Sequence, residues 1–206
     1  IPENKGLLAN QGRCYAVRAE QALSAGTDPS RDLQAGEAAL AKALALDARD
    51  RDSLQYLGEL RSTAAAWRSA HRRANPKDFD LAAQAFQRAL EVTPDSQETL
   101  LALAHLYRVR AAWERVAEQD PGPSLAQGHA ALARVLKARP RWGEALALRS
   151  SLLLEEAEGL APDGGGPKAR EALKGLSEAF AINRNLAQAW KPWADRAQRL
   201  ERTLNR

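Results

Sequence analysis

The chain has 206 residues, a formal net charge of +4, one cysteine, no methionine and 43 alanines. Alanine is the best helix former and strand-favouring residues are scarce, so the composition excludes a sheet protein and predicts an all-α fold. No apolar run reaches the roughly 20 residues of a membrane helix, and acidic residues accompany the basic ones, so neither a membrane protein nor, on charge alone, a nucleic-acid-binding protein is expected.

The sequence repeats itself with a period of 46 residues. Six columns of residues keep this register, which indicates an ancestral duplication of one structural module. The columns are Leu54/Leu100/Leu146, Gly12/Gly58/Ala104/Ser150, Trp67/Trp113, Pro94/Pro140, Ala43/Ala89/Val135 with Ala179 after a spacing of 44, and Asp28-Pro29/Asp120-Pro121.

Each period contains two predicted helices. Residues 52–73 place apolar side chains at three- to four-residue steps, which predicts a helix of roughly 33 Å that Asn75-Pro76 ends. A shorter helix follows at 78–92, and a turn around Pro94 closes the repeat. The third repeat copies this pattern, with helices predicted at 97–119 and 124–138.

The end of the chain departs from the pattern. Residues 161–167 contain three consecutive glycines, which predicts a flexible linker. A phosphate-binding loop is not predicted there, because no strand precedes the glycines and no Lys-Ser/Thr pair follows them. A last helix has no partner after it and is expected to cap the array.

The column of small residues predicts close helix packing, because a long side chain at these positions would hold the two helices of a pair apart. Each pair would leave an apolar face that only the next pair can cover, so the pairs are expected to stack into one solenoid over residues 1–206. The predicted units span 4–48, 50–94, 96–140 and 142–184, and the capping helix spans 186–205.

The repeats resemble the tetratricopeptide repeat, whose first helix carries a large residue, Leu-Gly and Tyr, and whose second carries Ala, a large residue, Ala and a closing Pro. The resemblance implies a right-handed α-solenoid of about four hairpins with a solvating last helix, as Trp190 and Trp193 suggest. One departure is the repeat length of 46 instead of 34 residues. The matching residues are Leu100, Leu103-Ala104, Tyr107, Gly128, Leu132, Val135 and Pro140 in the third repeat, and Leu54, Leu57-Gly58, Ala82, Phe86, Ala89 and Pro94 in the second.

Long helices joined through Asp-Pro turns, as at Asp28-Pro29, are similar to the repeat region that follows the kinase domain in bacterial serine/threonine protein kinases of the myxobacterial type. This resemblance implies a regulatory or targeting arm in a cytoplasmic bacterial signalling protein. Because the chain does not begin with Met, we expect it to be a piece of a longer polypeptide. It contains no Gly-rich phosphate loop, His-Arg-Asp or Asp-Phe-Gly motif, so it is not expected to be an enzyme.

No catalytic site, metal site or cofactor is predicted. The three histidines lack a second ligand at a metal-binding spacing. Cys14 is expected to be a small buried hydrophobe. Glu155, Glu156 and Glu158 are expected to form a solvated face, because nothing near them in the sequence supplies a partner acid or base.

A basic patch is formed by Arg61, Arg68, Arg72, Arg73 and Lys77, with no acid between the first and the last. Cations are favourable at the C-terminal end of a helix, which gives Arg72 and Arg73 a structural explanation. The patch could also bind an acidic partner or nucleic acid. It is not repeated cleanly in the next repeat, so a continuous stripe that follows phosphates is not favoured.

In the resembled family the first helices line a concave groove that binds peptides or protein segments. A clamp for a C-terminal carboxylate is not expected, because the Lys and Asn that it needs are absent. The mixed polar and apolar lining suits an extended or helical protein segment and not a small-molecule substrate. The groove positions carried over from the family are Gln55, Glu59, Leu101, His105, Arg108, Ser151 and Lys191.

The sequence therefore predicts a protein–protein interaction scaffold, as the regulatory or targeting region of a bacterial serine/threonine kinase. A stand-alone adaptor in secretion, motility or envelope assembly is the first alternative, and nucleic-acid binding through Arg61–Lys77 is the second. The exposed first helix, around Leu7 and Leu8, could also pair with a second copy of the chain.

Overall fold

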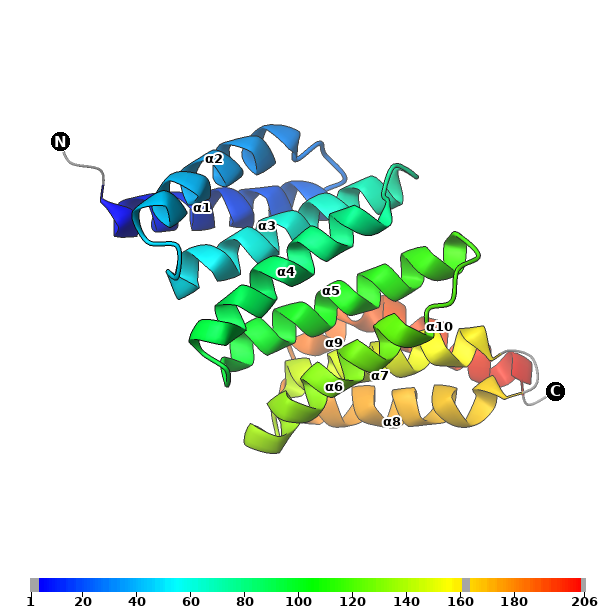
Figure 1. The fold of residues 1–206 in the computed structure, drawn as a ribbon. Coiled ribbons are helices and arrows are strands. Elements are labelled where there is room, and N and C mark those ends of the chain that lie inside the picture. Colours follow the sequence, from blue (N-terminus) through cyan, green and yellow to red (C-terminus); the bar gives the residue numbers. More distant parts are fainter. Residues whose placement is uncertain (1–3, 161–163, 205–206) are drawn as a thin grey trace. The chain divides into compact units, whose positions relative to one another are not determined.

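The structure is a computed structural model that describes residues 4–160 and 164–204. Within these residues all regular secondary structure is helical, as the composition predicts (Figure 1). The helices are α1 (Lys5–Ser24), α2 (Ser30–Leu46), α3 (Arg51–Ala70), α4 (Pro76–Val92), α5 (Gln97–Val116), α6 (Gly122–Ala138), α7 (Gly143–Gly159), α8 (Gly165–Ile182), α9 (Leu186–Ala189) and α10 (Lys191–Leu204).

The 46-residue period of the sequence is confirmed in the backbone. The first helices α1, α3 and α5 begin at Lys5, Arg51 and Gln97, and each has 20 residues. The second helices α2, α4 and α6 keep the same spacing, and each has 17 residues. The predicted helices at 52–73 and 97–119 end three residues too late, because a specific turn terminates each first helix.

That turn recurs at the same position in three repeats. Gly26, Arg72 and Glu118 have φ values of 69°, 56° and 56°, in the left-handed region that disfavours residues with a Cβ atom. The amide of the next residue donates to a carbonyl five positions back, which is the Schellman motif. These bonds run from Thr27 to Ala22 (2.9 Å), from Arg73 to Arg68 (2.8 Å) and from Gln119 to Glu114 (2.8 Å).

Glycine in place of Arg72 or Glu118 at the left-handed turn position should stabilise the protein. We expect Arg72→Gly and Glu118→Gly each to raise the free energy of unfolding by up to about 1 kcal/mol, because the relief of left-handed strain exceeds the entropy cost of glycine. Gly26→Ala should lower it by about 1 kcal/mol. Urea denaturation followed by circular dichroism measures all three, and a shift of all three variants in the same direction would contradict the assignment.

The chain divides into two compact halves, residues 1–102 and 103–206, and α5 spans the boundary. In the N-terminal half, α1 pairs with α2 and α3 with α4, while α3 also contacts α1 and α2 (Figure 1). In the C-terminal half, α7 pairs with α8 and also contacts α6, and α10 packs on α8 and α7. Hairpins of adjacent helices are thus confirmed within each half, and the single solenoid over the whole chain stays a prediction.

Within a pair, the helices approach closely at the predicted small column. A Cβ atom added to Gly58 would lie 2.6 Å from ring carbons of Phe86, and one added to Gly12 would overlap Leu40. Phe86 and Leu40 are fully buried. In the fourth repeat Ser150 takes the small position, and its partner helix supplies Gly175 directly opposite. The side chains on the two helices are therefore matched in size.

A larger side chain in the column of small residues should push the two helices of a pair apart. We expect Gly58→Ala to lower the free energy of unfolding by about 1–3 kcal/mol, because the buried Phe86 ring cannot move away without disturbing its neighbours. Gly159→Ala is the control, since no atom lies within 4 Å of an added Cβ there. Urea denaturation of both variants tests this, and equal destabilisation by the two would refute the packing argument.

Two predictions about the chain's last third need correction. Of the predicted linker at 161–167, residues 161–163 lie outside the described residues, and Gly165, Gly166 and Pro167 form the start of α8. Proline suits this place, because the first turn of a helix needs no amide donor from it. The predicted terminal helix is also interrupted, at Trp190 between α9 and α10.

The terminal segment covers apolar surface of α7 and α8, as predicted for a capping helix. Trp190, Trp193 and Ala194 pack against a buried cluster of Leu146, Ala147, Leu176 and Ala179. Trp193 and Leu200 pack against a second cluster that contains Leu153 and Ala172. The segment therefore shields the last hairpin from water.

Candidate protein-interaction site

The predicted groove positions on α3 form a hydrogen-bonded network with the first turn of α5. Arg51 Nη1 and Thr99 Oγ1 donate to Gln55 Oε1 over 3.0 and 2.9 Å, and Gln55 Nε2 donates to Glu59 Oε1 over 3.0 Å. Thr99 is fully buried and Gln55 is 9% exposed. The Gln55 amide is thus occupied inside the protein, whereas Glu59 accepts through one of its two oxygens.

Glu59 on α3 has a shifted pKa. Burial raises the pKa of its carboxyl group, and Glu20 on α1 adds to the effect, while the Gln55 hydrogen bond and Arg13 oppose it. The folded protein therefore holds a proton on Glu59 more tightly than the unfolded chain does. At neutral pH the ionised carboxylate reduces stability, which is a feature typical of functional sites.

Removal of this charge should stabilise the protein in a pH-dependent way. We expect Glu59→Gln to unfold at higher urea concentration than the parent at pH 7, because glutamine keeps an acceptor for Gln55 without a buried charge. Since the folded-state pKa is raised, the difference should shrink as the pH falls through that pKa. Urea midpoints between pH 7 and pH 4 measure it, and an advantage that grows as the pH falls would contradict the sign.

In the C-terminal half, α5 and α10 bring Arg108 against an aromatic ring. The Arg108 guanidinium lies 4.7 Å from the centroid of Trp193, and its Nη2 lies 3.3 Å from His105 Nε2. Burial, together with Arg196, lowers the pKa of Arg108 to about 10, although Glu155 opposes the shift. Within the described part of the chain, the buried Nε of Arg108 has no hydrogen-bond partner.

His105 is neutral beside this arginine. The surrounding protein and the Arg108 charge lower the pKa of the imidazole, although the His105 side chain is exposed to solvent. Its Nε2 can therefore accept a hydrogen bond from the guanidinium. His105 and Arg108 thus contact each other within α5, while their role in a groove stays a prediction.

An ion-pair network ties α5, α7 and α10 together beneath Arg108. Arg115 Nη2 lies 3.0 Å from both Glu155 Oε2 and Glu158 Oε2, and Arg196 pairs with the same two carboxylates. The Arg196 guanidinium also lies 5.0 Å from the Trp193 centroid. Glu155 is 3% exposed, so the predicted solvated face is wrong for this residue. Its partners come from helices that are distant in sequence.

Neutralising the centre of this network should destabilise the C-terminal half. We expect Glu155→Gln to lower the free energy of unfolding by about 3 kcal/mol, because Arg115 and Arg196 would lose their shared buried partner. Glu178→Gln, at an exposed position of α8, should stay within about 0.5 kcal/mol of the parent. Urea denaturation compares them, and equal effects would show that the network contributes nothing.

The other predicted groove residues have different surroundings. Ser151 is fully buried and its hydroxyl donates to the Leu148 carbonyl over 2.7 Å, so its side chain lies in the interior and not on an open surface. Leu101 is half-buried. Lys191 is 69% exposed and pairs with Asp195 over 2.7 Å. A contact of Lys191 with a partner would compete with this ion pair.

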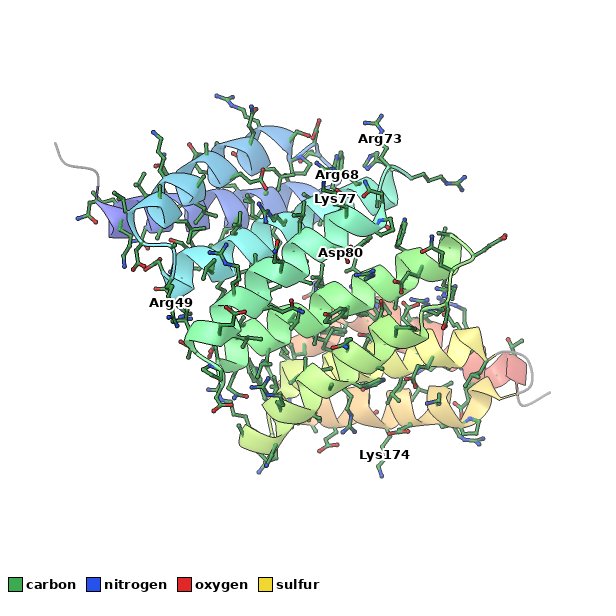
Figure 2. The ribbon with its side chains drawn as sticks, in the orientation of Figure 1. Arg49, Arg68, Arg73, Lys77, Asp80 and Lys174 are labelled. Atoms are coloured by element: carbon green, nitrogen blue, oxygen red, sulfur yellow. The ribbon has the colours of Figure 1, made fainter. Side chains whose placement is uncertain are left out.

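The basic patch is partly neutralised by acids from other helices. Arg61 Nε donates to Glu37 on α2 over 3.2 Å, and Arg68 pairs with Asp78 on α4. Arg72, Arg73 and Lys77 are exposed, and in the described residues none of the three side chains has an ion pair or hydrogen bond. Figure 2 shows Arg68, Arg73 and Lys77 together at the α3–α4 turn, while Arg49 lies at the other end of α3.

A pocket of about 230 Å³ opens between α2, α3 and α4 beside this patch. We call it the α2–α4 pocket. Sequence reasoning missed it, because the charges were compared along α3 alone and not with Glu37, one hairpin earlier. Trp67, which recurs as Trp113 in the sequence, is only half-buried here. The lining residues are Ser30, Leu33, Gln34, Glu37, Leu60, Arg61, Ala64, Trp67, Arg68, Asp78 and Leu81.

The corresponding helices of the C-terminal half carry basic side chains where the N-terminal half has acids, a lysine and a histidine that is charged only when protonated. His129 on α6 occupies the position of Glu37, and Lys168 on α8 that of Asp78. Glu156 on α7 pairs with both, at 3.0 Å from His129 Nε2. We call each set of cross-helix pairs an ionic strap. Gly159 stands where α3 has Trp67, so the aromatic wall of the pocket is specific to the N-terminal half.

Cys14 is exposed on α1, so its assignment as a buried hydrophobe is wrong. Leu7 is 69% exposed, in keeping with the predicted open face of the first helix. In the described ranges, no group of histidine, cysteine and acidic side chains is arranged to hold a metal ion. None of the helices described combines the length and apolar character needed to cross a bilayer.

No protein-family model matches the chain, and no curated protein matches it.

Proposed function

We propose that the chain is a protein-interaction module that binds segments of partner proteins on the faces of its first helices, and that it acts by binding and not by catalysis. The observation that carries this proposal is the presence of desolvated charges at positions expected to contact a partner, Glu59 on α3 and Arg108 on α5. A charge that is kept at a cost to stability is typical of a functional surface.

The two charges would recognise a partner backbone or side chain in complementary ways. The Arg108 guanidinium lies over the Trp193 ring and next to a neutral His105, so its position is set before a partner arrives. Glu59 has an oxygen that Gln55 does not use. Because packing and hydrogen bonds already fix these side chains, little ordering entropy is lost on the protein side when a segment binds.

The finer proposal is that this module is the regulatory or targeting region of a bacterial serine/threonine kinase, and the alternative is a stand-alone adaptor. It rests on the tetratricopeptide-like hairpins and the Asp-Pro turns. The gene sequence upstream of Ile1 discriminates between them, because only the first requires kinase motifs there. Nucleic acid is not favoured, since Glu37 and Asp78 occupy two of the five patch cations.

The proposal is tested by display selection of random peptides on the whole chain, followed by affinity measurement on variants. We expect a selected peptide that binds the N-terminal half to lose about tenfold in affinity on Glu59→Gln, and one that binds the C-terminal half to lose about tenfold on Arg108→Met, a loss of about 1.4 kcal/mol in each case. Lys174→Met is the matched control, because Lys174 is exposed on α8 (Figure 2). Failure to enrich any peptide, or equal affinity for all variants, would reject the proposal.

A further inference from the structure

The α2–α4 pocket has the size of an anchor site for one side chain. Pockets for drug-sized molecules span about 300–1,000 Å³, and this one has about 230 Å³. Leu33, Ala64, Trp67 and Leu81 line it, and each keeps part of its surface accessible. An aliphatic or aromatic side chain placed there would remove apolar surface from water on both molecules.

The two ends of the pocket differ in their free hydrogen-bonding capacity. Arg61 and Arg68 line it two turns apart on α3, or about 10 Å. At the Arg68 end the acid is saturated, because Asp78 accepts bonds from the Asn75 amide and side chain as well as from Arg68. Arg68 is 52% exposed and has five N–H groups, so donors remain for a second acceptor.

Further cations adjoin the same end. The Arg73 amide donates to the Arg68 carbonyl over 2.8 Å, and Lys77 lies in the first turn of α4, next to the Asp78 that pairs with Arg68. Neither cation has an ion pair within the described ranges. Asp28, on which Arg73 acts electrostatically, already accepts two hydrogen bonds from Ser30, and the exposed Asp80 lies farther along α4. At the opposite end, Glu37 keeps an exposed oxygen beside Arg61. The surface is thus positive at the Arg68 end, apolar in the middle and able to accept a hydrogen bond at the Arg61 end.

We propose that the α2–α4 pocket binds a short acidic segment of a partner protein, with an apolar side chain against Trp67 and the adjoining carboxylate on Arg68, Arg73 and Lys77. A protein segment fits better than nucleic acid, because the floor needs an aliphatic or aromatic side chain and the cations form no stripe along which phosphates could run. The site is separate from the proposed first-helix faces, since neither Glu59 nor Arg108 lines it.

The test uses two degenerate pools of short fluorescent peptides with the whole chain. In the first pool a central Leu, Ile or Phe is flanked by Asp or Glu, and in the second by Lys. We expect retention of the first pool and not of the second. Added salt should weaken the binding, because exposed charges carry part of it. Equal retention of the two pools, or of neither, would overturn the inference.

Variants then locate the retained peptides. We expect affinity losses of about tenfold or more for Ala64→Leu, which fills the floor, and for Arg73→Glu, while Arg49→Glu at the other end of α3 changes nothing. Both test positions have exposed surface, and circular dichroism checks that the variants fold. The proposal would be overturned if Ala64→Leu left the peptide affinity unchanged. It would also be overturned if a single-stranded oligonucleotide displaced the peptides and bound more tightly.

Glu59→Gln and Arg108→Met separate this inference from the proposed function. Both should leave the acidic pool bound, because they alter surfaces outside the pocket. If they released the peptides and Ala64→Leu did not, the first-helix faces would be the peptide site and the pocket inference would fail on its own.

Discussion

The close approach of the two helices within a pair is the constraint on which the rest of the structure depends. A small residue on the first helix lets a large, fully buried side chain of the second helix reach across, as Phe86 does over Gly58. The pair then presents fixed faces to its neighbours, so the side chains on those faces have defined positions. The α2–α4 pocket needs α3 held at this distance from α4, because both helices line it.

Helix content, the period and the small column could be predicted, because each depends on local propensity or on a repeated contact. Helix ends were less accurate, since the left-handed turn at Arg72 and Glu118 is not signalled by glycine as it is at Gly26. Backbone conformations that a residue adopts against its preference are set by the surrounding packing and leave little trace in the sequence.

Charge pairing was the least predictable feature of the candidate site. Arg61 and Arg68 read as parts of one basic patch, yet Glu37 and Asp78 reach them from neighbouring helices. Glu155 read as solvated, yet two arginines from α5 and α10 bury it. Long charged side chains form pairs across helices, and the fold determines which helices are neighbours. The residues of one helix therefore do not show which charges pair. His105 and Arg108 contact each other because residues three apart share a face of a helix.

The opposite signs of the two ionic straps bear on how a chain of similar modules avoids mistaken pairings as it folds. If α6 docked where α2 belongs, His129 would meet Arg61, and if α8 took the place of α4, Lys168 would meet Arg68. Each exchange brings together two basic groups. Repulsion between like charges would thus disfavour packing against the wrong copy of a helix. The straps would favour the correct helix pairs as the duplicated segments fold.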